Sequence, residues 1–226
     1  LPYKPRRVPT LRVPSILDPN ALAADDANIA EMMTWASTIV KLPLVRGGDR
    51  LRKRLTTFDA RYLLFPEMLA QVDITLDSGS GLTVRTFRRS SGDGPDLVGL
   101  DAPGVAPTIW RVLHRDHSVS DDVARQLPGL FRRENVRVSY ALPMGQGRRE
   151  DGEFWAWFPL LDRTTAQGLF NAPWQVNDDR TSMLPGSQLN WELLGVAAEL
   201  LIDAAVKEST PADPAKHFDI LPARGR

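Results

Sequence analysis

Two alternating segments joined by a short turn constrain the fold of this 226-residue chain most directly. In residues 71–76 and again in residues 82–89, apolar side chains alternate with polar ones, which is typical of strands with one buried face. The stretch DSGSG at residues 77–81 between them carries the residues that a tight turn needs. The pattern therefore predicts an antiparallel hairpin. Its predicted inward side chains are Val72, Ile74, Leu76, Leu82, Val84 and Phe87.

Further strand and helix patterns alternate along the chain without a βαβ rhythm. Residues 135–144 and 152–161 predict two strands that pair antiparallel across the loop between them. Residues 90–104 are rich in Gly, Pro, Asp and Ser and predict a mobile loop. Helices are predicted from Pro19 through an apolar pattern that ends at Val40, and at residues 189–206. The predicted fold class is therefore α+β, with antiparallel hairpins in a sheet, packed helices and a C-terminal amphipathic helix.

Charge and composition narrow the classes of partner. The chain has 28 basic and 28 acidic residues, so we do not expect it to hold nucleic acid by overall charge. The basic run at residues 50–54 is interpreted as the solvated face of a short helix, with Leu51 and Leu55 on its buried side. The absence of cysteine excludes disulfides and suits a cytoplasmic protein. No apolar run approaches the ~20 residues that span a bilayer, so no membrane partner is expected.

Two short motifs give only weak evidence for a nucleotide site or a metal site. The sequence DSGSG, which begins at Asp77, matches the D-x-G-x-G pattern that holds adenine in Bergerat-fold ATPases, but Glu31 is followed four residues later by Trp35 instead of a magnesium-binding Asn. A hairpin turn explains the motif fully. His114 and His117 could share a metal only if further ligands converged on them, so no metal site is predicted.

A polar loop at residues 170–186 (FNAPWQVNDDRTSMLPG) follows an aromatic run, FWAWF, at residues 154–158. The aromatic run is apolar on both faces, which is consistent with a central strand or with a platform for a ligand. In the loop, Arg180 either pairs with Asp178 or Asp179 at the start of the last helix, or it projects a planar fork toward a phosphate. The sequence of the loop does not distinguish these two interpretations.

Residues 152–204 resemble a segment of bacterial sacsin-like, heat-shock-chaperone-like proteins of the Bergerat-fold (GHKL) ATPase family. The resemblance is carried by a strand that ends in Phe-Pro, followed by NAPW, DDRT and LPG, and then by Asn and a helix. Residues 31–44 and 58–76 resemble the region just after the nucleotide domain of that family less closely. The chain begins with Leu, and we expect it to be a segment of a longer protein.

The resemblance implies a middle or transducer segment. Residues 1–70 would be the end of an upstream ATPase domain and a helical connector, and residues 71–226 an α+β middle domain. ATP and Mg²⁺ would bind in the upstream domain, with no cofactor in this chain, which alone is not expected to be catalytic. The chain would couple ATP binding to closure and to binding of a protein partner in a cytoplasmic chaperone.

The resemblance also suggests roles for residues of the polar loop. Arg180 would be the catalytic cation that reaches the nucleotide, because a positive charge placed on closure stabilises the phosphoryl group as it leaves. The ligand-binding residues around it would be Asn171, Asn177, Asp178 and Asp179. The alternative is a stand-alone protein-interaction domain without any link to an ATPase.

Overall fold

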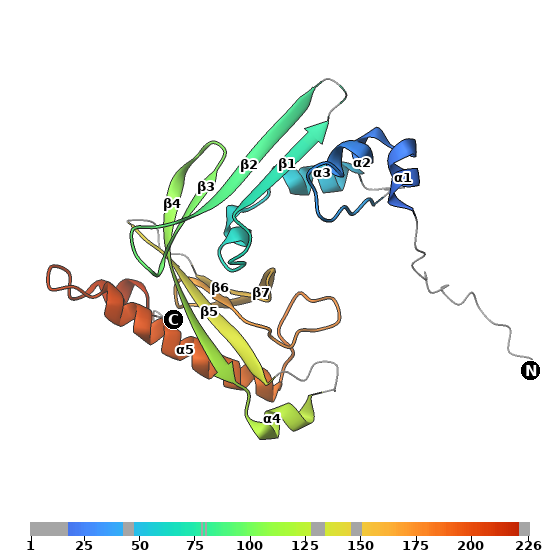
Figure 1. Ribbon diagram of the computed structural model, residues 1–226. Coiled ribbons are helices and arrows are strands. Elements are labelled where there is room, and N and C mark those ends of the chain that lie inside the picture. Colours follow the sequence, from blue (N-terminus) through green and yellow to red (C-terminus); the bar gives the residue numbers. More distant parts are fainter. Residues whose placement is uncertain are drawn as a thin grey trace, which may run out of the picture. The chain divides into compact units, whose positions relative to one another are not determined.

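The computed structural model describes residues 18–42, 48–77, 79, 81–127, 134–145 and 151–221 (Figure 1). The chain folds as two compact units, residues 1–51 and 52–226, which are described separately. The proline-rich start of the chain, for which the sequence allows an extended edge segment, lies outside the described residues. Residues 52–70, which the sequence assigned to the connector, belong to the unit that contains the sheet.

The N-terminal unit contains the short helices α1 (Pro19–Asp25) and α2 (Ala27–Met32). Asp18 caps α1 and Pro19 lies in its first turn, as predicted. The prediction that the helix continues to Val40 is wrong, because α2 ends at Met32. The apolar side chains beyond that point find no core: Trp35 is 74% exposed and Val40 77% exposed. Without such packing, a short helix has little stability in water.

The C-terminal unit is built on one sheet of eight strands in the order β1-β2-β3-β4-β5-β8-β6-β7 (Figure 1). Every neighbouring pair is antiparallel except β6 and β8, which are parallel. Helix α5 packs against β4 and β5. The predicted α+β class is confirmed. The strands are β1 (Gln71–Asp77), β2 (Leu82–Ser91), β3 (Leu97–Ala102), β4 (Val105–Ser118), β5 (Asn135–Pro143), β6 (Gly152–Trp155), β7 (Pro159–Thr164) and β8 (Leu169–Asn171).

The remaining helical elements largely follow the sequence patterns. The C-terminal helix predicted at residues 189–206 is α5, and the basic helix predicted at residues 50–54 is α3, whose Leu51 is nevertheless 42% exposed. None of the described helices is both long and apolar enough to cross a bilayer. The elements are α3 (Gly48–Thr56), η1 (Ala60–Leu63), α4 (Asp121–Gln126), α5 (Gln188–Glu208) and η3 (Lys216–Asp219).

The predicted hairpin is β1–β2, but two of its inward residues were assigned to the wrong face. Phe87 lies opposite Val72 and is buried, whereas Leu82 and Val84 are 70% and 60% exposed. Because strand faces alternate with a period of two, the face that contains Phe87 also contains Arg85. The Arg85 guanidinium lies 5.0 Å from the centroid of the Phe87 ring in a cation–π contact. Arg85 thus lies on the inward face, which the sequence assigned to Leu82 and Val84.

Two further predictions about the sheet are wrong. The loop predicted at residues 90–104 contains β3, in which Val98 and Leu100 are buried on one face. The predicted pairing of β5 with β6 does not occur, because the three-residue strand β8 lies between them. The cause is the same in both cases: short strands are specified by the neighbours that cover them more than by their own composition.

The two faces of the sheet carry separate hydrophobic clusters. On the face covered by α5, Val138 and Tyr140 of β5 pack with Leu193 and Leu200 of the helix. On the opposite face, Trp155 packs with Leu63 of η1 and with the buried side chains of β1–β4. Strand β6 therefore has both faces covered, as its aromatic pattern predicts.

Gly168, directly before β8, allows a close approach of the backbone to β5. It has a φ of +105°, and a Cβ there would lie 2.6 Å from Cε2 of Tyr140 and 2.7 Å from the carbonyl oxygen of Ala141. The hydroxyl of Tyr140 donates to the carbonyl of Gln167 at 2.6 Å, and burial raises the pKa of Tyr140 well above its usual value. Residues 167 and 168 are therefore held firmly against β5.

We expect Gly168→Ala to lower the free energy of unfolding by about 2–4 kcal/mol, because it combines a disfavoured φ with a clash against backbone. Gly104→Ala is the matched control: Gly104 has a φ of +75° but nothing within 4 Å of an added Cβ, so only about 1 kcal/mol should be lost. Urea denaturation of both variants measures the difference. Equal losses in the two variants would contradict the close approach at Gly168.

Candidate functional site

A cavity of about 780 Å³ opens in the C-terminal unit, between the β6–β7 turn, the loop that leads from β8 to α5, and the first turn of α5. This volume lies within the range of roughly 300–1,000 Å³ that is typical of ligand pockets. One wall is apolar, and a polar turn containing Asn177, Asp178 and Arg180 lines another part. The apolar wall includes Val119, Leu127, Val136, Leu160, Trp174 and Leu189.

Two residues with unusual backbone conformations line this cavity. Among the described non-glycine residues, two have positive φ angles, Trp157 at 65° and Arg180 at 56°. Both belong to the cavity lining. A left-handed backbone costs on the order of 1–3 kcal/mol at a non-glycine residue and concentrates at functional sites. The coincidence of both outliers at one cavity marks it as the candidate site.

The first outlier is held by Asn171, the last residue of β8. Its side chain is buried, and its Oδ1 accepts a hydrogen bond from the backbone N–H of Trp157 at 2.9 Å. This bond fixes the turn between β6 and β7. Trp157 and Phe158 are consequently 52% and 67% exposed at the mouth of the cavity instead of continuing the buried strand. Asn171, predicted to bind a ligand, acts in the structure as a support for an aromatic rim.

The second outlier lies at the tip of a small hairpin. Val176 and Met183 form an isolated antiparallel bridge, and the N–H of Arg180 donates to the carbonyl of Asn177 at 2.9 Å. The Asn177 side-chain Oδ1 accepts from the N–H groups of Thr181 and Ser182 at 3.0 and 3.1 Å. The side chain of Asn177 therefore closes the turn on which Arg180 is carried.

Asp179 strengthens the same turn. Its Oδ1 accepts from the Thr181 hydroxyl at 2.6 Å and from the Thr181 N–H at 3.2 Å, and these bonds lower the pKa of Asp179 below its usual value. Asp178, in contrast, is exposed on the cavity side. Of the four predicted ligand residues, Asn171, Asn177 and Asp179 thus accept hydrogen bonds from backbone N–H groups. Asp178 is exposed and, like Asn177, lines the cavity.

The hairpin is attached to α5 by a buried asparagine that was not predicted as part of the site. Asn190 accepts from the N–H of Gln175 and donates to the carbonyl of Gln175, both at 2.8 Å. The residue that caps α5 is Ser187, whose Oγ accepts from the Asn190 N–H at 3.1 Å. An asparagine inside the first helical turn is a weak signal for such a bond, because its side chain competes for backbone partners.

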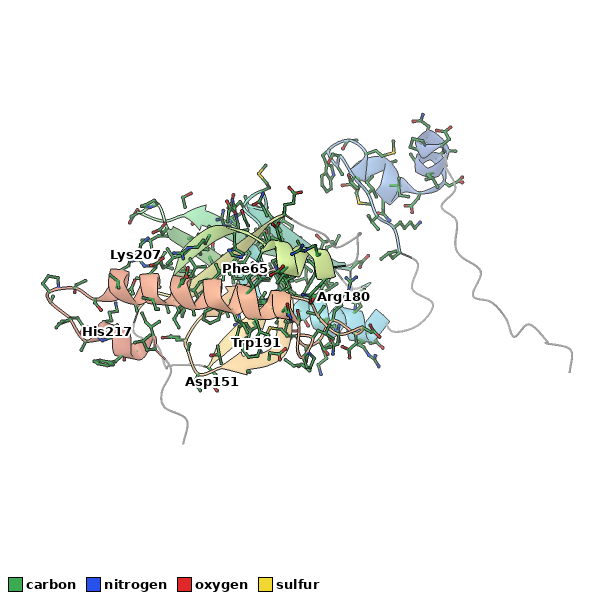
Figure 2. The ribbon with its side chains drawn as sticks, turned by 90° about the horizontal axis from the view of Figure 1, so that it is seen from below. Phe65, Asp151, Arg180, Trp191, Lys207 and His217 are labelled. Carbon is green, nitrogen blue, oxygen red and sulfur yellow. The ribbon has the colours of Figure 1, made fainter. Side chains whose placement is uncertain are left out.

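The guanidinium of Arg180 is exposed and forms no ion pair with the residues that the structure describes. The interpretation that it pairs with Asp178 or Asp179 to cap the last helix therefore finds no counterpart in these residues, and Ser187 fills the capping role. Figure 2 shows Arg180 at the N-terminal end of α5, opposite the end that carries Lys207. Hydrogen bonds to the side chains of Asn177 and Asp179 hold the turn, and the positive charge of Arg180 is not neutralised by any of the described residues.

Trp174 contributes a buried polar atom to the cavity wall. The residue is 4% exposed, its ring meets that of Phe154 edge to face at 5.6 Å, and its Nε1–H has no hydrogen-bond partner among the described residues. An unsatisfied buried donor costs about 1–3 kcal/mol. This part of the wall is therefore less stable than its apolar packing implies.

The other motifs do not form a site. His114 and His117 lie on opposite faces of β4: His114 Nδ1 is 2.8 Å from Ser139 Oγ, and His117 Nε2 is 2.6 Å from Oε1 of Glu192 on α5. No group of three or more possible metal ligands occurs within the described ranges. Asp77 forms part of the hairpin turn, where its Oδ1 accepts from the Gly79 N–H at 2.8 Å.

Comparison of the chain with models of protein families, with curated proteins and with solved structures gave no match. Function is therefore inferred from the geometry of the cavity and from the sequence resemblance described above.

The unsatisfied donor of Trp174 can be tested by substitution. We expect Trp174→Phe to lower the free energy of unfolding by no more than ~1 kcal/mol, because removal of the unpaired N–H offsets part of the lost packing. Trp155→Phe is the matched control: its ring is fully buried, and its Nε1 donates to Glu153 at 3.1 Å, so we expect a loss of about 2–4 kcal/mol. Chemical denaturation is the measurement. A larger loss for Trp174→Phe would mean that its N–H is bonded.

Proposed function

We propose that this chain is the coupling segment of a cytoplasmic chaperone-like ATPase, and that Arg180 supplies positive charge to a nucleotide held by an upstream domain. The proposal rests on the backbone conformation and the unpaired charge of Arg180. This residue occupies a left-handed position that Gly or Asn would adopt at lower cost, and its side chain has no ion pair among the described residues. Local stability does not explain an arginine there, whereas a phosphate contact made on closure does.

The surrounding residues suit this role. A cation that stabilises a leaving phosphoryl group must be placed accurately and must be unpaired before closure. Asn177 and Asp179 fix the backbone of the turn, and Asn190 ties the base of the hairpin to α5. A movement of α5 would therefore be transmitted to Arg180 through the two hydrogen bonds at Gln175.

The variant Arg180→Gly separates function from stability. In the full-length ATPase we expect turnover to fall by about 10²–10⁴-fold, with the dissociation constant for ATP changed less than about threefold, because the contact forms mainly in the transition state. The isolated chain should be as stable as the parent chain or more stable by up to ~1 kcal/mol, because glycine relieves the left-handed strain.

Two further variants control this experiment. Arg180→Lys retains the charge without the planar fork and should recover only part of the turnover. Arg125→Ala removes an exposed arginine of α4 that pairs with Asp122 and does not line the cavity, and it should leave turnover unchanged. Normal turnover in Arg180→Gly would refute the coupling role.

A second candidate function is a stand-alone protein-interaction domain, and the exposed aromatic rim favours it. Trp157 and Phe158 lie beside an apolar cavity with Arg180 near them, and Trp, Tyr and Arg next to a desolvated pocket are typical of binding hot spots. In this case the same residues would hold an apolar side chain of a protein partner, with an acidic group against Arg180.

Selection of displayed peptides against the chain distinguishes this alternative. If the cavity binds protein, we expect the selected peptides to combine an aromatic or aliphatic residue with an acidic one, and Phe158→Ala to weaken their binding by at least about tenfold. The control Leu161→Ala alters a side chain that is 70% exposed and outside the cavity lining, and should have no effect. Peptides that bind both variants equally would exclude the cavity as their site.

A further inference from the structure

A second hollow, of about 410 Å³, adjoins the cavity and shares one lining residue with it, Phe158. Its walls come from the end of α3, from η1 and the segment between them, and from the β6–β7 turn. Because Phe158 is 67% exposed, the two hollows meet at an exposed ring. The residues that line this aromatic hollow are Arg54, Leu55, Thr57, Phe58, Tyr62 and Phe158.

The aromatic side chains of this hollow form one packed group around Tyr62. The centroid of the Tyr62 ring lies 5.3 Å from that of Phe58 and 5.8 Å from that of Phe158. On its other side the Tyr62 ring meets the fully buried ring of Trp155 edge to face at 5.2 Å. Aromatic side chains that the core holds in place lose little conformational entropy on binding, so they suit contact with an apolar side chain of a partner.

The arginines around the end of α3 differ in what their guanidinium groups contact. Arg52 Nη2 donates to the carbonyl of Asp77 at 2.9 Å, and Arg85 Nη1 donates to the carbonyl of Leu55 at 3.2 Å. These bonds attach the end of the helix to the β1–β2 hairpin. Arg54 lines the hollow and is exposed, and its side chain forms no ion pair or hydrogen bond with the described residues. The described part of the fold therefore gives the charge of Arg54 no partner.

Tyr62 adds a second donor to the same hollow. Its hydroxyl forms no hydrogen bond with the described residues, and burial raises the pKa of Tyr62, so the hydroxyl keeps its proton at neutral pH. The Thr57 hydroxyl, in contrast, already donates to the backbone carbonyls of Lys53 and Arg54, at 3.1 and 3.2 Å. The two free polar side chains of the hollow are thus both donors, and a carboxylate is the group that complements a guanidinium beside a hydroxyl.

We propose that the cavity and the aromatic hollow together bind one extended segment of a protein partner, which places an apolar side chain in each and acidic residues against Arg54 and Arg180. This inference rests on the second candidate function and names the partner that it requires. Side chains on one face of an extended segment follow each other at about 7 Å, so one segment can fill hollows that meet at a single ring, that of Phe158.

The walls favour a protein segment over single-stranded nucleic acid, which also stacks on aromatic rings and pairs with arginines. Over both linings, two arginines stand against Asp178, an excess of one positive charge, whereas a nucleic-acid groove follows the phosphates with several cations. Much of the cavity wall is aliphatic and suits an apolar side chain better than a flat, polar base. These aliphatic residues are Val119, Leu127, Val136, Leu160 and Leu189.

Exchange of charge between the chain and its peptides tests the new anchor. Peptides are selected from a displayed library against the full 226-residue chain, and we expect a consensus of two apolar residues between two acidic ones. Arg54→Glu should weaken the binding of such a peptide by at least about tenfold, and replacement of one of its acidic residues by Lys should restore most of the affinity.

Two variants of neighbouring residues make this result specific. Lys53→Glu is the matched control: it makes the same change of charge one residue away, at an exposed position outside the lining, and should alter binding less than about twofold. Tyr62→Phe removes the hydroxyl and keeps the ring, so it should weaken the parent peptide by about three- to tenfold. It should not affect a peptide in which the acidic residue opposite Arg54 is replaced by its amide.

The outcomes separate this inference from the function on which it rests. If Phe158→Ala weakens the peptides but Arg54→Glu has no more effect than Lys53→Glu, the cavity alone binds protein and the two-hollow site is wrong. If no peptide is selected, or if the peptides bind Phe158→Ala as tightly as the parent chain, the protein-interaction function fails as well. A short oligomer of deoxythymidine that binds as tightly as the peptides would assign the surface to nucleic acid and would overturn the proposal.

Discussion

The short strand β8 holds the C-terminal unit together. Its three buried residues pair with β5 on one side and with β6 on the other, and so join the β1–β5 part of the sheet to the β6–β7 hairpin. The strand fits there because Gly168 lets the backbone pass against Tyr140. The position of Asn171, and with it the turn that presents Trp157, follows from this pairing.

The polar side chains around the cavity form hydrogen bonds mainly with backbone groups. Asn171, Asn177 and Asn190 each accept from main-chain N–H groups, and together they hold two left-handed turns and the base of a hairpin. A cluster of Asn and Asp resembles a ligand set in the sequence. In the structure it supports two exposed side chains, Trp157 and Arg180, at the edge of an apolar cavity.

One helix connects the cavity to the sheet. Leu189 in the first turn of α5 lines the cavity, and Leu193 and Leu200 of the same helix pack against β5. A displacement of α5 would reach the hairpin through Asn190 and Gln175.

The sequence by itself determined the local elements: the start of the first helix at Pro19, the β1–β2 hairpin, the long C-terminal helix and the α+β class. It also drew attention to the loop that carries Arg180. Tertiary structure decided which strand lies beside which, which face of β2 is inward, and where the helix after Pro19 ends. The physical reason is that caps, turns and periodicity act over a few residues, whereas the neighbours of β8 and the bonds of Asn190 depend on residues far away in the chain. The left-handed backbone of Arg180 has no sequence signal at all, because an arginine adopts it only where the surrounding hairpin imposes it.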